Sequence, residues 1–305
     1  MSDLDAAALD HAERLPDPTR RLLVSAIDPG APDAWQRDVL LAYLRMFERI
    51  FDRDVPGGDA ERELAADLNR ICGRESSSDV DADITAAEEE IRAAFEGRGY
   101  AFLGGRTPPY LGPYIWSRTE DRRFVVALPR GEPQEVTVHF MHDFLLRGWL
   151  HWRSLGEHGA GGWYQQDNPP WPDGLYCVAE RYPEPLETNR SFQVSLLGHE
   201  AQHVADHLAY PGHLDSGALE YRAKLVELIG YESADERLRF FTDDAADDPE
   251  QPHPWAAHRI INDLAGRLVV DVDDRDALLA VPYPEVRRVA LELLDEDTAR
   301  LSAPA

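Results

Sequence analysis

LLGHEAQHV, residues 196–204, is the stretch around which this sequence is organised, because it holds the pattern His-Glu-x-x-His. In a helix of about 3.6 residues per turn, His199 and His203 lie one turn apart on the same face, so both imidazoles can bind a single metal ion. Glu200 lies beside them, where its carboxylate can accept a proton from a metal-bound water. The stretch therefore predicts a helix that carries a metal site.

The helix predicted around this motif, residues 188–209, has two contrasting faces. At roughly 100° per residue, ionisable groups flanked by apolar ones share the motif face, namely Phe192, Leu196, His199, His203, Asp206, His207 and Tyr210. The opposite face is apolar throughout and consists of Val194, Leu197, Ala201, Ala205 and Leu208. The alternative is that the histidines form hydrogen bonds in a polar core or are solvated. That alternative suits a lone histidine better than this pair with its intervening glutamate.

A catalytic zinc site takes three ligands from the protein and leaves one position for water. His207 lies on the motif face, but it is about two turns, or ~12 Å of helix rise, beyond His199, so one ion cannot bind both. The next helix, predicted from about residue 216 to residue 229, offers Glu220 in its first turns. We expect Glu220 to be the third ligand, with Asp215 as the next possibility. The alternative for Glu220 is an exposed, salt-bridged stripe with Lys224 and Glu227.

The HEAQH helix, residues 199–203, followed by a second helix that offers Glu220, resembles the gluzincin branch of the zincin metallopeptidases. The resemblance implies one Zn²⁺ per chain, with His199, His203 and Glu220 as ligands and Glu200 as general base. Zinc would lower the pKa of a bound water, and Glu200 would take its proton during attack on a peptide carbonyl. The resemblance also implies a small mixed sheet, with one edge strand over the cleft, before the motif helix. GLYCVAERY, residues 174–182, has the composition of a strand at that place.

The sequence departs from the thermolysin-like pattern at one position. That pattern places an Asp four residues after the ligand Glu, where it orients a ligand His, and this chain has Lys224 there. Asp206, one turn after His203, is the candidate to orient the histidine instead. Stabilisation of the oxyanion needs a further donor, and the candidates are His207, Tyr210, Arg222, His253 and His258. For each of these an ordinary structural role is favoured, and for Arg222 this role is pairing with a buried carboxylate.

The pattern of the whole chain predicts an α+β protein that is mostly helical. Residues 1–98 are expected to form an all-helical region, and residues 99–305 a zincin-like metal-binding domain with its sheet and motif helices in 99–230. Helices are predicted at Asp3–Leu15, Pro18–Ile27, Pro32–Asp52, about 59–72, 76–97, 143–155, 234–241, 256–268 and 284–301. Strands are predicted at 100–103, 114–118, 123–128, 135–140 and 174–182.

The composition limits the classes of partner that the protein is expected to bind. The chain has 57 acidic and 31 basic residues and a formal net charge of −26, which disfavours nucleic acid and anionic lipid as partners. Two cysteines without a CxxC pattern argue against a disulfide scaffold or a cysteine zinc site. The acidic start of the sequence lacks the basic and apolar regions of a signal peptide, so none is expected, and no apolar run approaches about 18 residues. We therefore expect a cytoplasmic protein that acts on a peptide or protein substrate.

Two other functions remain open at this point. One is a zinc-binding protein of zincin fold without peptidase activity, which acts as a binding or regulatory protein through its helical segments. The other is a metal-free helical interaction protein in which the motif is fortuitous. Analysis of bound metal separates this last possibility from the other two.

Overall fold

The computed structural model describes most of the chain, namely residues 2–15, 34–107, 109–166, 171–231 and 235–302. The protein is α+β and 58% helical, as the sequence predicted. Its residues form two compact units, one made of Met1–Glu120 with Met141–Ala160 and the other of Asp121–Phe140 with Gly161–Ala305. The boundary expected after residue 98 falls within the first unit.

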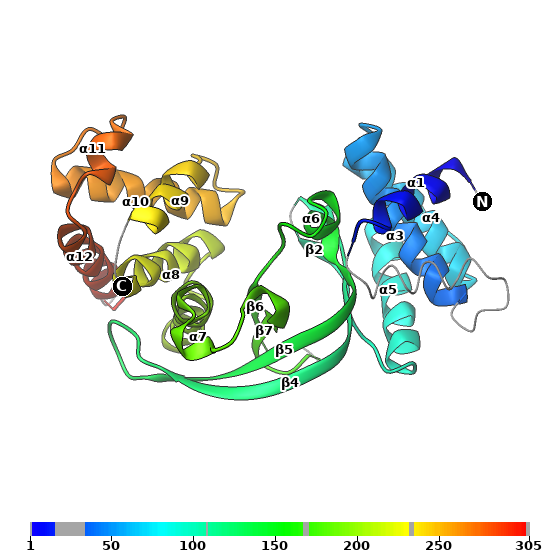
Figure 1. Cartoon of the computed structure of the whole chain (residues 1–305), viewed down its shortest axis with the longest axis horizontal. Helices are drawn as coiled ribbons and strands as arrows, with labels where there is room; N and C mark the ends of the chain where they lie inside the picture. Colours follow the sequence, from blue (N-terminus) through cyan, green and yellow to red (C-terminus); the bar gives the residue numbers. More distant parts are fainter. Residues whose placement is uncertain (1, 16–33, 108, 167–170, 232–234, 303–305) are drawn as a thin grey trace. The chain divides into compact units, whose positions relative to one another are not determined.

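The first unit is built on four helices that share one apolar core (Figure 1), namely α1 (Asp3–Ala12), α3 (Ala34–Asp52), α4 (Gly57–Cys72) and α5 (Val80–Glu96). Helix α3 is buried on every side through its middle, because residues 39–44 and 46–48 are all buried. Helix α4 ends at Gly73, which adopts the left-handed conformation that glycine tolerates. The helix expected at Pro18–Ile27 lies outside the described residues.

Five strands form one sheet in the order β1-β4-β5-β7-β6. They are β1 (Ala101–Leu103), β4 (Tyr114–Val126), β5 (Gln134–Arg147), β6 (Gly162–Gln165) and β7 (Gly174–Val178). Strand β1 pairs antiparallel with β4, and β6 pairs antiparallel with β7, where Trp163 is opposite Tyr176. A second small sheet pairs β2 (Arg106–Thr107) with β3 (Tyr110–Leu111). The strand expected over 174–182 ends at Val178, where a 3₁₀ turn, Ala179–Arg181, follows.

Two sequence predictions in this region were wrong. The strands expected at 114–118 and 123–128 are one continuous strand, β4. The helix expected over 143–155 is shorter, because β5 continues to Arg147 and only α6 (Gly148–Arg153) is helical. The apolar run at 144–146 is compatible with a buried strand as well as with a helix face, and here it is buried within β5.

The second unit carries the motif helix and the helices around it. A 3₁₀ turn, Leu186–Thr188, and a π-helical segment, Ser191–Gly198, lead into α7 (His199–Ala209). Further helices follow, namely α8 (Ser216–Gly230), α9 (Asp235–Asp244), α10 (Pro252–Leu268), α11 (Arg275–Leu279) and α12 (Tyr283–Leu301). Helix α8 packs against α7, α10 and α12, as Figure 1 shows. It is therefore buried along most of its length, which brings its polar side chains into the interior.

The helices of the second unit share two apolar cores. One core lies among α8, α9, α10 and α12. The other lies between the sheet and the π-helical and α7 segments. Leu197 and Ala201 of the apolar face lie in the core against the sheet, together with Phe192 and Leu196 of the motif face, whereas Leu208 is 71% exposed. The two motif histidines face α8. In the described part of the chain, no helix combines the length and the apolarity that crossing a bilayer requires.

Candidate metal centre

The two motif histidines lie side by side at the start of α7. Their rings are 4.8 Å apart between centroids, and the two Nε2 atoms are 3.1 Å apart. Both side chains are buried, with 5% of His199 and 8% of His203 exposed. Helical spacing of four residues produces this proximity, because successive turns place both side chains on the face that meets α8.

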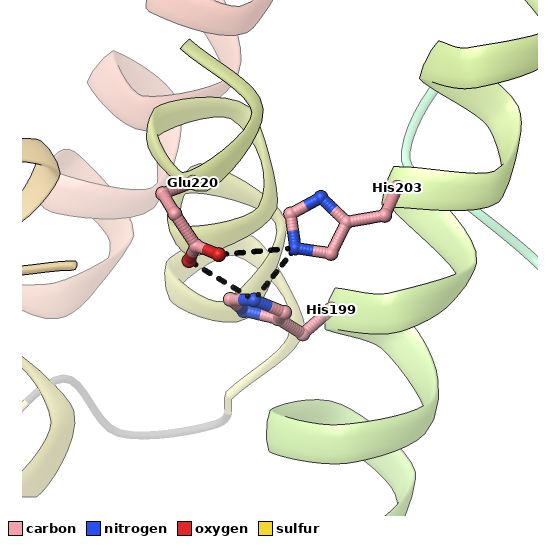
Figure 2. Close-up of side chains that lie close together, drawn as sticks. All are labelled: His199, His203 and Glu220. Carbon is pink, nitrogen blue, oxygen red and sulfur yellow. Dashed lines mark hydrogen bonds and ion pairs between the residues drawn. The ribbon is translucent and has the colours of Figure 1, made fainter. Parts of the chain in front are cut away.

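Glu220 approaches the two histidines from α8 (Figure 2). Its Oε2 lies 3.3 Å from Nε2 of His199, and its Oε1 lies 3.4 Å from Nε2 of His203. Among the described residues, these three form a group whose possible ligand atoms all lie within 4.8 Å of one another. Asp215, the other candidate for the third ligand, is instead the N-cap of α8, where its carboxylate accepts the backbone N–H of Ala218 at 2.7 Å.

The charges of this group are strongly coupled. Burial by itself raises the pKa of Glu220, but the imidazoles of His199 and His203 outweigh burial and hold that pKa well below its usual range. Burial lowers the pKa of His199, whereas the carboxylates of Glu220 and Glu227 raise it, with a net value of about 10. The site is therefore a buried cluster in which the carboxylates of α8 favour the protonated form of His199.

Glu227 is the main site residue that the sequence interpretation missed. Its Oε1 lies 2.7 Å from Nδ1 of His199, the nitrogen that faces away from Glu220. Glu227 is 3% exposed, and its other oxygen pairs with Arg237 on α9. A carboxylate on the second nitrogen fixes the tautomer and the orientation of a ligand histidine. The signal in the sequence is the spacing of seven residues from Glu220, which puts both carboxylates on one face of α8.

Glu200, the expected general base, is buried beside strand β6. Its Oε2 accepts the backbone N–H of Tyr164 at 2.9 Å, and 8% of the residue is exposed. Strand β6 lies at the edge of the sheet, and one of its two sides pairs with β7. Among the described residues, its other side is not paired with a strand of this sheet. The N–H of Tyr164 thus points away from β7, toward the motif helix.

The hydrogen-bond partners of Asp206 are Arg222 and Gln202 rather than the motif histidines. Both of its oxygens accept Nε of Arg222 at 2.9 Å, and Gln202 donates to the same carboxylate at 2.8 Å. Arg222 also donates to Asp297 of α12 at 3.0 Å. Asp206 was expected to orient a ligand histidine, but Nδ1 of His203 is buried and has no hydrogen-bond partner among the described residues. The expected pairing of Arg222 with a buried carboxylate is confirmed, and this cluster joins α7, α8 and α12.

The other candidate donors to the oxyanion differ in their distance from His199, His203 and Glu220. Nδ1 of His253, in the first turn of α10, lies 2.8 Å from Oε2 of Glu220. His207 is near the Tyr164 ring, with 5.7 Å between the centroids, and burial lowers its pKa. Tyr210 lies under the guanidinium of Arg222, and His258 pairs with Asn262 on its own helix. The structure therefore brings His253 into the site and gives the others partners elsewhere.

Lys224, which stands where the thermolysin-like pattern has Asp, is buried in the second unit. Its Nζ lies 4.7 Å from the centroid of the Phe241 ring and 4.0 Å from a carboxylate oxygen of Asp244. Burial lowers the pKa of its ammonium, although nearby carboxylates oppose the shift. The Lys224 side chain contacts α9 rather than a motif histidine, whereas Glu227 is the carboxylate of α8 that lies against Nδ1 of His199.

Comparison with known proteins adds no relative to this description. No family model matches the chain, and no curated protein or solved structure matches it. The resemblance to the gluzincins therefore depends on the motif residues alone and stays a prediction from the sequence.

Proposed function

We propose that this protein is a cytoplasmic, zinc-dependent metallopeptidase with a zincin-like core. His199, His203 and Glu220 would hold one zinc ion. The observation that carries the proposal is the convergence of two imidazole nitrogens and a carboxylate, from facing helices, within 4.8 Å of one another. Two histidines and one glutamate, with a fourth position for water, are a common ligand set of catalytic zinc sites.

The chemistry of the three side chains fits a metal ion. Oε2 of Glu220 is buried without a hydrogen bond of good geometry, although three imidazoles surround the carboxylate. The Nε2 atoms of the two histidines lie close together and face the same carboxylate. A divalent cation can accept lone pairs from the two imidazole nitrogens and the carboxylate at the same time. The contact of Glu227 with His199 adds the carboxylate that commonly supports a ligand histidine.

Glu200 and strand β6 support the assignment of the reaction. Bound zinc would act as a Lewis acid that polarises a substrate carbonyl and makes a water more acidic. Glu200 would accept the proton and pass it to the leaving amine. The N–H of Tyr164 holds one oxygen of Glu200 in place at 2.9 Å. Because β6 is an edge strand, an extended peptide can add to it beside the motif helix.

The experiment that tests this function combines metal analysis with hydrolysis of a broad peptide library. We expect the purified protein to carry about one zinc per chain and to cleave peptides in the library. His199→Ala should lose the metal, whereas Glu200→Gln should keep the metal and lose hydrolysis. Undiminished turnover in Glu200→Gln would contradict the assignment of Glu200 as general base.

The second candidate is a zinc-binding protein of the same fold that binds or regulates a partner without cleaving it. The replacement of the expected aspartate by the buried Lys224 favours this candidate. It predicts one zinc per chain and no cleavage of any library peptide. Specific cleavage that disappears in Glu200→Gln would reject it.

A further inference from the structure

A second site is suggested by a pocket of about 850 Å³ in the second unit, lined by residues other than the proposed zinc ligands. The end of α8, the start of α12 and the turn after β4 form its walls. The residues that matter for the argument are four arginines and two tyrosines, namely Arg130, Arg190, Arg287, Arg288, Tyr231 and Tyr283. Its volume is within the range of about 300–1,000 Å³ that is common for small-molecule sites.

The lining of this pocket is rich in arginine, although the chain as a whole is acidic. The sequence has 57 acidic and 31 basic residues, yet the lining contains four arginines and no acidic residue. Arg130 pairs with Asp295 at 2.6 Å, and Arg288 pairs with Glu292 at 2.6 Å, so each is held in place from outside the lining. Arg287 is exposed and makes no ion pair with a carboxylate in the part of the chain that the structure describes. A guanidinium offers several N–H donors that match phosphate and carboxylate oxygens.

The two tyrosines give the pocket a fixed aromatic wall. The hydroxyl of Tyr283 donates to the backbone carbonyls of Leu228 and Tyr231. The hydroxyl of Tyr231 lies 2.5 Å from that of Ser195. Because both hydroxyls are bonded to neighbouring segments, the rings are held in the absence of any ligand. A preformed aromatic surface next to guanidinium groups suits an organic anion with an apolar body.

We propose that this pocket binds a small organic anion that carries two or more negative charges on phosphate or carboxylate groups. The net charge of −26 repels nucleic acid, so a small ligand fits the surrounding field better than a long phosphate backbone. This proposal is independent of the zinc site, because none of the proposed zinc ligands lines the pocket.

Calorimetric titration of the purified full-length protein tests the proposal, with adenosine diphosphate as the phosphate probe and citrate as the carboxylate probe. We expect at least one probe to bind with a Kd below about 1 mM. Arg287→Glu should weaken that binding by about tenfold or more, because it replaces attraction by repulsion next to the anion. The probe that binds more tightly identifies which of the two groups the pocket prefers.

The matched control is Arg123→Glu, which changes the net charge equally on the exposed surface of β4, where the Arg123 side chain is 81% exposed. Any heat from chelation of bound metal is the same in wild type and in both variants, so it cancels in the comparison. Arg190→Glu, on a separate segment of the pocket, provides a second variant if Arg287→Glu is not folded. The absence of saturable binding of both probes up to about 10 mM, or equal weakening by Arg287→Glu and Arg123→Glu, would overturn the proposal.

Discussion

Oε1 of Glu227 lies 2.7 Å from Nδ1 of His199, so a buried carboxylate of α8 supports a histidine of α7 from the side opposite to Glu220. This contact makes the metal group part of a larger polar arrangement. Arg237 of α9 pairs with the other oxygen of Glu227. The orientation of His199 is thus determined by two helices besides its own.

Replacing Glu227 by Gln should weaken zinc binding by about 10- to 100-fold, because it removes the charge that orients His199 while all three ligands remain. Competition with a chromogenic zinc chelator measures this change. Glu292→Gln on α12 is the control, since Glu292 is a carboxylate paired with Arg288, with 45% of its side chain exposed. Equal zinc affinity in wild type and Glu227→Gln would show that the contact does not support the metal site.

Replacing Asp206 by Ala should lower the free energy of unfolding by about 2 kcal/mol, because the buried guanidinium of Arg222 would lose one of its two carboxylate partners and keep only Asp297. The zinc content should not change, because Asp206 contacts Arg222 and Gln202 rather than a motif histidine. Urea unfolding and metal analysis of the same preparation measure both quantities. Loss of zinc with unchanged unfolding would instead support a role for Asp206 in orienting His203.

The stability of the metal-free protein should fall as the pH rises from neutral. The carboxylates around His199 raise its pKa to about 10 against the opposing effect of burial. This value lies above the pKa of about 6.5 in an unfolded chain, so the stabilisation is complete below about pH 6.5 and is lost as the pH approaches 10. Urea unfolding at several pH values should show a steeper decline for wild type than for His199→Gln. Identical slopes would contradict a protonated His199 in the metal-free cluster.

His253→Ala should weaken zinc binding by about tenfold or more, because Nδ1 of His253 lies 2.8 Å from Oε2 of Glu220 and restricts that carboxylate. His258→Ala is the matched control on the same helix, since His258 pairs with Asn262. Zinc titration of both variants measures the difference. Equal zinc affinities in the two variants would show that His253 does not contribute to the metal site.

Much of the candidate metal site could be predicted from the sequence, because the spacing of its two histidines is a local feature of one helix. The four-residue interval between His199 and His203 determines their common face once a helix is assumed. The prediction of Glu220 as a ligand required one further assumption, namely that α8 turns back and packs against α7. The structure has this packing. The helical nature of α3, α10 and α12 followed equally from their apolar periodicity.

The remaining features depend on tertiary contacts that no local pattern specifies. Glu227 resembled part of an exposed charged stripe, and only the burial of α8 among α7, α10 and α12 makes it an interior group. Asp206 had the correct spacing to orient His203, but the guanidinium of Arg222 competes for both of its oxygens. The extent of β5 was missed because the apolar run at 144–146 suits a strand or a helix equally.

The zinc content of the purified protein, measured together with that of His199→Ala and Glu220→Gln, tests the central claim most directly. We predict about one zinc per wild-type chain, and strongly reduced zinc in both folded variants, because each variant removes one of three protein ligands. A folded wild-type protein that takes up no zinc after incubation with the ion, or variants that retain as much zinc as wild type, would contradict the assignment of His199, His203 and Glu220 as a zinc site.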